Sequence, residues 1–337
     1  MTYWVAFDLD QTIGCFESVH PFLTVFFPDV LQQVYRPPYW DGPVMPKLDI
    51  STKDKKILYE AFRDFVKWMA VSENKNLLLR PGIIPIISLL LKAKKKGIVG
   101  GLMIYSNNSN PYMLHFAHEL LKVMIGVTEP IFCHLVHWWH PLRNIEVRGP
   151  QYKPVLQLGH GFKTVDTIRK AFSTYPCLSK NVISSSQILF FDDLIHKKIS
   201  DIIPAQNYFH VQPYHHYGDF DTIYKCFLTA LMIHNIDANV HLLHEYTKVG
   251  LLIGIEKEQM NSFSKEIHVS GTQNVFDSEV IFKRLSKYLK IDMSYSITNK
   301  NIDIVLPPSR PFNKPISETR TIKYGSGKTR KARRKRS

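Results

Sequence analysis

The chain has 337 residues, of which 45% are hydrophobic, and a formal net charge of +14. That length and hydrophobic content suffice for one large core, or for a core domain and a smaller one. The best apolar run, Ile83–Leu91, is short and contains a proline, which argues against a membrane-spanning helix. We therefore expect a soluble, intracellular protein, cytoplasmic or nuclear, and we see no signal peptide in the opening residues MTYWVAFD.

The predicted elements begin with an apolar strand around Val5–Phe7, which runs directly into the acids of DLDQT at Asp8–Thr12. Residues 15–78 look like an insertion, and they include an amphipathic helix over Lys53–Val71. From Leu78 onward, strands and helices alternate. The elements expected there are a helix from Arg80 to about Lys96, a strand ending at Ser106, a helix over Pro111–Val123, a strand over Ile131–Val136, a helix over Thr164–Phe172, a strand over Gln187–Phe191 and a helix over 222–235.

This alternation is typical of an α/β fold with a doubly wound parallel sheet, in which ligands bind at the carboxyl ends of the strands. We expect a catalytic core over 1–22 and 79–235, with a cap or flap insertion over 23–78. Residues 236–312 are expected to form a small α+β extension. Its expected elements are a helix near Ser278–Leu289 and possible strands at Val249–Ile255, Glu266–Val269 and Ile302–Leu306.

Three of the predicted parallel strands end in polar residues, which should lie at one edge of the sheet. These residues are Asp8 and Asp10 after the first strand, Ser106, Asn107 and Asn108 after the second, and Asp192 and Asp193 after the third. Carboxylates this close together repel one another unless a cation lies between them, and their hard oxygen atoms suit Mg²⁺. A metal held in this way recruits a phosphate group, whose remaining oxygens need a lysine and hydroxyl or amide donors.

The same segments resemble the motifs of a known superfamily. DLDQT at Asp8–Thr12, the serine of MIYSNN at Met103–Asn108 and FFDD at Phe190–Asp193 are similar, in order, to three motifs of the haloacid dehalogenase superfamily, over residues 1–22 and 79–215. Within it they resemble the Mg²⁺-dependent phosphatases and the RNA polymerase C-terminal-domain phosphatase (NLI-interacting-factor-like) branch. Gln11 stands where that branch usually carries glutamate. The resemblance implies a Rossmann-like catalytic core.

The resemblance also implies roles for the acids. Asp8 would attack phosphorus and form an aspartyl-phosphate, and Asp10 would protonate the leaving oxygen and then deprotonate the attacking water. Mg²⁺ would be held by the Asp8 carboxylate, the Asp10 backbone carbonyl and Asp193. Asp192 would lie farther from the ion or reach it through a water molecule.

The phosphate oxygens need donors, and the resemblance implies Ser106 and the backbone amide of Asn107. For the lysine we choose Lys163, because it lies just ahead of the helix that feeds the last predicted strand. Lys153 and Lys180 remain open as alternatives. Thr12 is also expected to bind phosphate, and it should cap the turn that follows Asp8.

Two groups of potential metal ligands receive a simpler interpretation. His134, His137 and His140 have no usual zinc spacing and no cysteine pair beside them, so packed histidines are favoured over a zinc site. The four cysteines lie far apart in the sequence, which favours ordinary buried thiols in a reducing compartment. They are Cys15, Cys133, Cys177 and Cys226.

The first functional hypothesis is a Mg²⁺-dependent phosphatase acting on a phosphoprotein (at serine or threonine) or on another phosphomonoester. A second keeps the chemistry but takes a nucleic-acid end such as a 3′-phosphate as substrate. A third, from another class, is a catalytically inactive interaction protein on the same fold. A generic phosphatase assay separates the first two from the third.

The basic charge is concentrated in one terminal segment. Residues 313–337 hold ten Lys or Arg residues and one acid, and too few large apolar side chains to fold alone. Such a tail could recruit nucleic acid or an acidic partner. It resembles the tails of many proteins from large DNA viruses, which would place this protein in an infected host cell or a virion.

Overall fold

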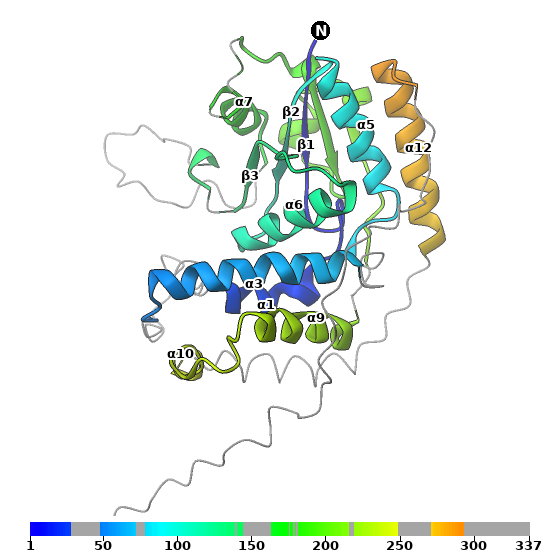
Figure 1. Cartoon of the computed structure of the whole chain (residues 1–337). Helices are drawn as coiled ribbons and strands as arrows, with labels where there is room; N and C mark the ends of the chain where they lie inside the picture. Colours follow the sequence, from blue (N-terminus) through cyan, green and yellow to red (C-terminus); the bar gives the residue numbers. More distant parts are fainter. Residues whose placement is uncertain are drawn as a thin grey trace, which may run out of the picture. The chain divides into compact units, whose positions relative to one another are not determined.

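Five parallel strands form a central sheet in the described part of the chain. The structure is a computed structural model, and it describes residues 1–27, 48–71, 78–138, 140–143, 163–174, 176–177, 179, 181–215, 219–248 and 271–292. Their spatial order is β3 (His134–Val136), β2 (Val99–Tyr105), β1 (Tyr3–Phe7), β4 (Ile188–Asp192) and β5 (Tyr208–His210). The first three of these are labelled in Figure 1. β1 is paired in parallel with both β2 and β4, so the chain leaves β1 to one side and later returns to the other. The sheet therefore has a topological switch point between β1 and β4, where α/β folds bind their ligands.

Helices precede and follow these strands. They are α1 (His20–Phe26), α3 (Thr52–Val71), α5 (Ile83–Lys95), α6 (Pro111–Ile125), α7 (Val165–Ser173), α8 (Lys197–Ser200), α9 (Phe220–Ile233), α10 (Val240–Lys248) and α12 (Gly271–Leu289), with 3₁₀ turns at Glu17–Val19, Pro141–Arg143, Ser185–Gln187 and Ala205–Asn207. Helix α6 begins at the capping side chain of Asn110, which accepts from the amide of Tyr112, and it ends at Gly126 in the left-handed region (φ 74°).

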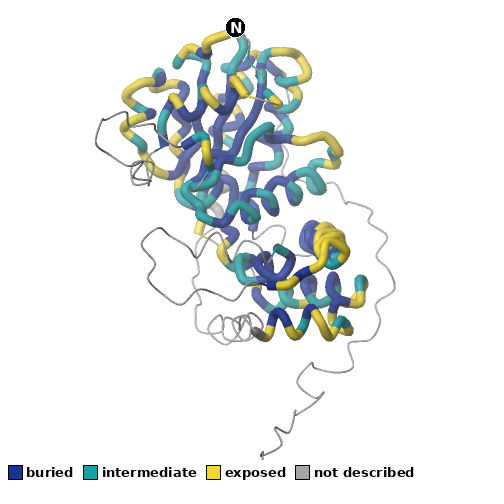
Figure 2. The backbone as a smooth tube through the Cα atoms, turned by 90° about the vertical axis from the view of Figure 1, so that its left-hand side faces the viewer, coloured by how far each residue is buried: buried dark blue, intermediate teal, exposed yellow. Residues whose placement is uncertain are grey.

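Both faces of the sheet are covered, because β1 buries alternate side chains on opposite sides. Val5 and Phe7 belong to the larger apolar core, which also takes side chains from α3, α5, α6 and α12. Trp4 and Ala6 belong to a second core on the other face, with α7. The sheet strands are accordingly buried along most of their length (Figure 2). These observations confirm the predicted α/β fold with a parallel, Rossmann-like sheet.

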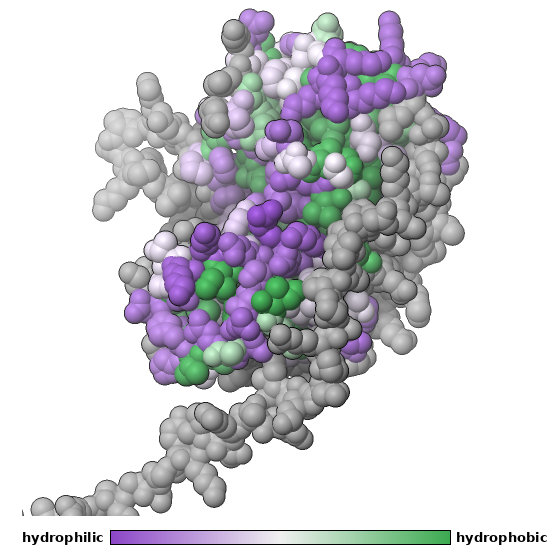
Figure 3. All heavy atoms as spheres, in the orientation of Figure 1, coloured by the Kyte–Doolittle hydropathy of each residue, from purple (hydrophilic) through white to green (hydrophobic). Residues whose placement is uncertain are grey.

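The insertion contributes a layer of helices beside the core. Helix α3 packs against α1, α6 and α9, and its buried face carries Phe62, Phe65 and Met69 at helical spacing. Its outer face is polar, and Figure 3 shows hydrophilic side chains interspersed with small apolar patches in that region. Helix α9, which falls within the residues assigned to the catalytic core, thus packs on the helices assigned to the cap. A separate cap remains a prediction.

The insertion leaves and re-enters the core at one narrow place. The amide of Cys15 donates to the carbonyl of Leu78 (2.8 Å), and the amide of Arg80 donates to the carbonyl of Ile13 (2.9 Å). At Gly14, an added β carbon would lie 2.1 Å from the carbonyl oxygen of Leu78, so the two chain segments approach closely only because this residue is glycine. We call this pair of segments the neck.

The C-terminal region contributes α10 and α12. Helix α12 packs against α5 and joins the larger core, and its Tyr288 donates to the side chain of Asn207 (2.7 Å). The strands predicted at Val249–Ile255, Glu266–Val269 and Ile302–Leu306 lie outside the described residues, and so does the tail at 313–337. Among the described helices, none is both long enough and apolar enough to cross a membrane.

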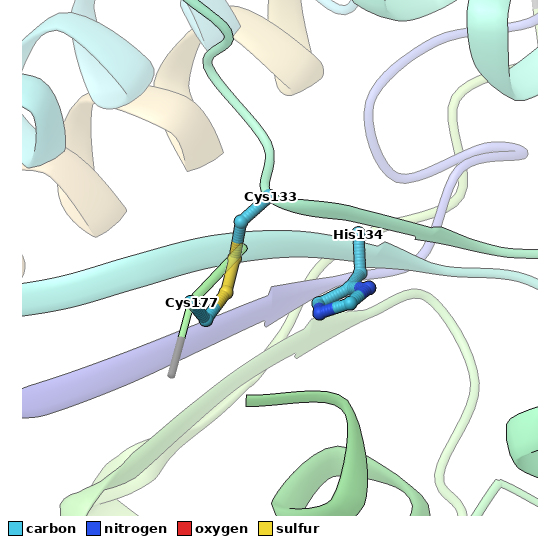
Figure 4. Close-up of side chains that lie close together, drawn as sticks. All are labelled: Cys133, His134 and Cys177. Atoms are coloured by element: carbon cyan, nitrogen blue, oxygen red, sulfur yellow. A yellow bond between two sulfur atoms is a disulfide. The ribbon is translucent and has the colours of Figure 1, made fainter. Parts of the chain in front are cut away.

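One expectation about the cysteines is wrong. Cys133, just before β3, and Cys177, after α7, form a disulfide with a Cα–Cα distance of 6.0 Å (Figure 4). Cys15 and Cys226 are buried and take no part in a disulfide. The pairing follows from the fold, because β3 and the end of α7 lie together although 44 residues separate the cysteines in sequence.

Candidate active site

The carboxyl ends of β1 and β4 bring three of the predicted acids together. Asp8 follows β1, and its amide donates to the carbonyl of Phe191 (2.8 Å), which fixes it beside the end of β4. Asp192 is the last residue of β4, and Asp193 follows it. One carboxylate oxygen from each of the three aspartates lies within 4.8 Å of the other two. The cluster lies at the switch point of the sheet, the place expected for a ligand.

A buried lysine holds two of these carboxylates. Nζ of Lys163 lies 2.6 Å from Oδ1 of Asp8 and 2.6 Å from Oδ2 of Asp192, with a side chain only 1% exposed. The residue after it caps α7, and the amide of that residue, Thr164, donates to the hydroxyl of Tyr105 (3.0 Å). The structure therefore brings Lys163 to the predicted site. The alternatives at positions 153 and 180 lie outside the described residues.

Burial and neighbouring charges shift the pKa values of Asp8 and Asp192 in opposite directions. Burial raises the pKa of Asp8 to about 8, with Asp192 and Asp10 adding to the effect against the opposing charge of Lys163. Burial also favours the protonated form of Asp192, but the contact with His196 and the charge of Lys163 hold its pKa below the ordinary value. The two carboxylates thus share one ammonium group, and Asp192 is the one that stays ionised. Asp8 needs further positive charge nearby to become a carboxylate at neutral pH.

Asp10 faces the loop that follows β2. The side-chain amide of Asn108 donates to Oδ2 of Asp10 (3.0 Å), and burial raises the pKa of the Asp10 carboxyl. Its other oxygen, Oδ1, is buried and has no hydrogen-bond partner among the described residues. A buried oxygen of this kind is costly unless a proton, a ligand or a cation completes it.

Thr12 connects the two acidic loops directly. Its hydroxyl donates to Oδ1 of Asp193 (3.1 Å) and accepts from the amide of Asp193 (3.0 Å). These bonds give Thr12 a positioning role, and its predicted contact with phosphate stays a prediction. Burial, followed by the charge of Asp192, raises the pKa of Asp193.

Arg80 supports the turn after Asp10, although the sequence analysis assigned it only to the start of a helix. Arg80 is 2% exposed and donates from Nε to the carbonyl of Thr12 (2.8 Å) and from Nη2 to the carbonyl of Gln11 (2.8 Å) and to the carbonyl of Gln212. Gln11 has a φ of 61°, an unusual value for a residue other than glycine. The guanidinium fixes this unusual turn by holding its carbonyl oxygens.

A second arginine, which the sequence analysis did not single out, supports the loop after β2. Arg143 is 3% exposed and donates to the carbonyl of Ser106 (2.8 Å) and to the side-chain oxygen of Asn107 (2.8 Å). Its guanidinium lies over the rings of Tyr105 (5.2 Å) and Trp138 (5.8 Å). Within the loop, the amide of Asn108 donates to the hydroxyl of Ser106 (3.0 Å), so the predicted phosphate donors are held as a unit. The only sequence signal is an arginine within an aromatic segment.

Comparison with known proteins finds no family model that matches the chain, no similar curated protein and no similar solved structure.

The donor set fits a small divalent cation. Three carboxylates supply hard oxygen atoms within 4.8 Å of one another, which suits Mg²⁺. The one positive charge of Lys163 is too small to balance the negative charge of the three clustered carboxylates and Asp10 when all are ionised. Asp193 has one oxygen bonded to Thr12, whereas Asp192 uses Oδ2 for Lys163 and Oδ1 for the amide of Leu194 (2.8 Å). Asp8 and Asp193 are therefore better placed than Asp192 to ligate an ion directly.

Replacing Arg143 with lysine should disorder the loop after β2. Arg143 bonds the Ser106 carbonyl and the Asn107 side chain from two separate nitrogens, Nη1 and Nη2, and its flat guanidinium lies over two aromatic rings. A lysine has one nitrogen on a shorter side chain, so it cannot reproduce these paired bonds and the ring contacts together. The phosphatase hypothesis drawn from the sequence then predicts at least a tenfold loss of kcat/KM for a phosphate ester, with KM rising more than kcat falls, since the loop would hold phosphate and not transfer protons. Arg169→Lys on α7 is the matched control, because Arg169 also bonds a backbone carbonyl, that of Ile183. Equal kinetics in R143K and R169K would contradict this role.

Proposed function

We propose that the protein is a Mg²⁺-dependent phosphatase of the haloacid dehalogenase type, which hydrolyses phosphomonoesters through an aspartyl-phosphate. The observation that carries the proposal is the cluster of Asp8, Asp192 and Asp193 at the switch point of a parallel sheet, with the buried Lys163 in contact with Asp8 and Asp192. The resemblance of DLDQT, MIYSNN and FFDD to the motifs of that superfamily supports the same conclusion.

The side chains divide the reaction into two steps. In the first, an oxygen of Asp8 forms a bond to phosphorus as the bond to the leaving oxygen breaks, and Asp10 gives that oxygen a proton. In the second, Asp10 takes a proton from a water molecule, which attacks phosphorus and releases phosphate and the Asp8 carboxylate. Burial raises the pKa of Asp10, which suits a group that must begin protonated. The bond from Asn108 keeps its carboxyl group in place.

The cations of the site assist both steps. Lys163 would neutralise phosphate oxygens beside Asp8, and the loop at Ser106 and Asn107 would donate to the others. Mg²⁺ would be held by Asp8, by Asp193 and by the Asp10 carbonyl. When bound, it supplies positive charge for the transferring phosphoryl group and for the Asp8 carboxylate. Asp192 keeps Lys163 in place from the other side.

The substrate class rests on residues near but outside this cluster. We favour a phosphoprotein or another phosphomonoester, with the insertion acting as a cap that excludes water and selects the substrate. A nucleic-acid 3′-phosphate is the alternative substrate, which the basic tail favours. An inactive interaction protein with the same fold remains the alternative from another class.

The test of the proposal is hydrolysis of an aryl phosphate by the full chain in Mg²⁺ and in EDTA. We expect turnover with Mg²⁺ and none with EDTA, and restoration when Mg²⁺ is added back. If folded protein shows no turnover with Mg²⁺, the phosphatase proposal is refuted and the inactive interaction protein is the remaining hypothesis. Parallel assays with a phosphoserine peptide and an oligonucleotide carrying a 3′-phosphate then separate the two substrates.

The two neighbouring aspartates at the end of β4, Asp192 and Asp193, should differ in their effect on metal binding. Asp193→Ala removes a carboxylate with an oxygen available for the ion, so Mg²⁺ affinity should fall by about tenfold or more. Asp192→Ala removes the partner of Lys163, so it should weaken metal binding less and lower stability more. Calorimetric titration of Mg²⁺ into both variants checks the order. A larger loss of affinity in D192A would assign the direct ligand to Asp192.

A further inference from the structure

The disulfide has a histidine beside it. Cys133 and His134 are consecutive at the start of β3, and Cys177 reaches them from the segment after α7 (Figure 4). The two sulfur atoms and one imidazole nitrogen all lie within 4.8 Å of one another. Two thiolates and an imidazole are the ligand types that zinc prefers, and this His134 is one of the three histidines whose spacing alone gave no site.

All three side chains are accessible from the surface. Each residue is partly exposed, and the two cysteines, but not His134, line a surface hollow of about 990 Å³ together with Gly100 and Gly101. At Gly101, an added β carbon would lie 3.2 Å from Sγ of Cys133 and 3.5 Å from Sγ of Cys177. Glycine at this position of β2 therefore leaves both sulfur atoms more room than a residue with a side chain would.

We propose that reduction of the Cys133–Cys177 disulfide creates a Zn²⁺ site formed by these two cysteines and His134, with a water molecule as the fourth ligand. In the reduction, the S–S bond breaks and takes up two electrons and two protons from a dithiol, which itself becomes a disulfide. Each cysteine thiol then releases its proton to water as its thiolate binds the ion.

The zinc site would keep the two ends of one chain segment linked, and that segment carries two residues of the candidate active site. The segment between Cys133 and Cys177 carries Arg143 and Lys163, the two buried cations that hold the loop after β2 and the aspartates. The disulfide ties the ends of this segment in an oxidising environment. A zinc ion bound to the same sulfur atoms ties them in a reducing one, so the segment stays closed in either state. This inference does not depend on the phosphatase reaction.

Cobalt provides a direct test, because Co²⁺ bound to thiolates absorbs by charge transfer and Co²⁺ bound to carboxylates does not. The reduced full chain, in excess Mg²⁺ to occupy the aspartate cluster, should bind one Co²⁺ per chain with this absorption, and Zn²⁺ should displace it. Oxidation to the disulfide should abolish the absorption. Cys177→Ser should also abolish it, and His134→Gln should weaken Co²⁺ binding at least tenfold.

Matched controls are Cys226→Ser and His137→Gln, which replace a cysteine and a histidine outside the three-residue cluster and should leave the absorption unchanged. Circular dichroism checks that each variant is folded, and if C177S unfolds, the comparison of reduced and oxidised parent protein gives the same test. The proposal is overturned if the folded, reduced parent shows no charge-transfer absorption, if C177S keeps it, or if H134Q binds Co²⁺ as tightly as the parent. None of these readouts measures phosphatase activity.

Discussion

Asp8→Asn should lower phosphatase turnover by a factor of about 10⁴ or more in a protein that remains folded. An amide cannot form the bond to phosphorus that the carboxylate forms. Asp192 cannot take its place, because its two oxygens are held by Lys163 and by the amide of Leu194. Hydrolysis of an aryl phosphate with Mg²⁺ measures the loss, and circular dichroism checks the fold.

The control for this substitution is Asp166→Asn on α7. Asp166 is an exposed carboxylate paired with Arg169, so its loss should leave turnover unchanged. Turnover in D8N equal to that of D166N and of the parent would remove Asp8 from the reaction.

The same substitution should stabilise the metal-free protein, and more so as pH rises. The pKa of Asp8 is 3.8 in a model peptide and about 8 in the fold, chiefly because of burial. Below about pH 4 both states hold the proton; between about pH 4 and 8 only the folded state keeps it, so rising pH favours unfolding. Asparagine has no proton to lose. In EDTA, the unfolding free energy of D8N minus that of the parent should grow across this range, by on the order of 1 kcal/mol or more. A difference that is constant with pH would contradict the raised pKa.

Lys163→Met should lower the free energy of unfolding by about 3–5 kcal/mol. The substitution keeps much of the buried aliphatic volume but leaves Asp8 and Asp192 close together without the shared ammonium group. Urea unfolding in EDTA at neutral pH measures the loss. It should shrink at acid pH, where the two carboxyl groups bind protons instead.

Two comparisons make the Lys163 experiment specific. Lys122→Met removes a partly exposed pair with Glu119 on α6 and should cost less than about 1 kcal/mol. The double variant D8N/K163M should lose less stability than K163M alone, because one of the two unpaired acids is gone. A cost for K163M no larger than that for K122M would show that the lysine is not the counterion of the cluster.

The strands that carry the acids could be predicted because each is a continuous apolar run that stops at a polar residue. β1, β2 and β4 end at Phe7, Tyr105 and Asp192, within a residue or so of the ends expected from the sequence. Lys163 could be chosen from its place before α7. Short elements gave no comparable signal: β5 has only three residues, Tyr208–His210, and β3 begins at His134, three residues later than expected.

The contacts that assemble the site could not be predicted in the same way, because they join residues distant in sequence. Arg143 reaches the loop at Ser106, and Arg80 reaches the turn at Gln11, because the fold brings these distant segments together. The hydroxyl of Thr12 bonds Asp193, which is 181 residues away. The disulfide depends in the same way on β3 lying beside the end of α7. The local sequence pattern identifies which residue types lie at the carboxyl ends of the strands, whereas tertiary packing decides which residues they contact.

The neck formed by Ile13–Cys15 and Leu78–Arg80 closes the insertion into a loop with fixed, adjacent ends. For such a loop the entropic cost of closure grows only with the logarithm of its length, by about 0.6 kcal/mol for each doubling. Outside α1 and α3, whose buried faces pack in the core, residues can thus be added to or removed from the insertion without altering the register of β1 or the start of α5. Substrate preference, if it resides in the insertion, can diverge by changes in length while the aspartates and Lys163 stay in place.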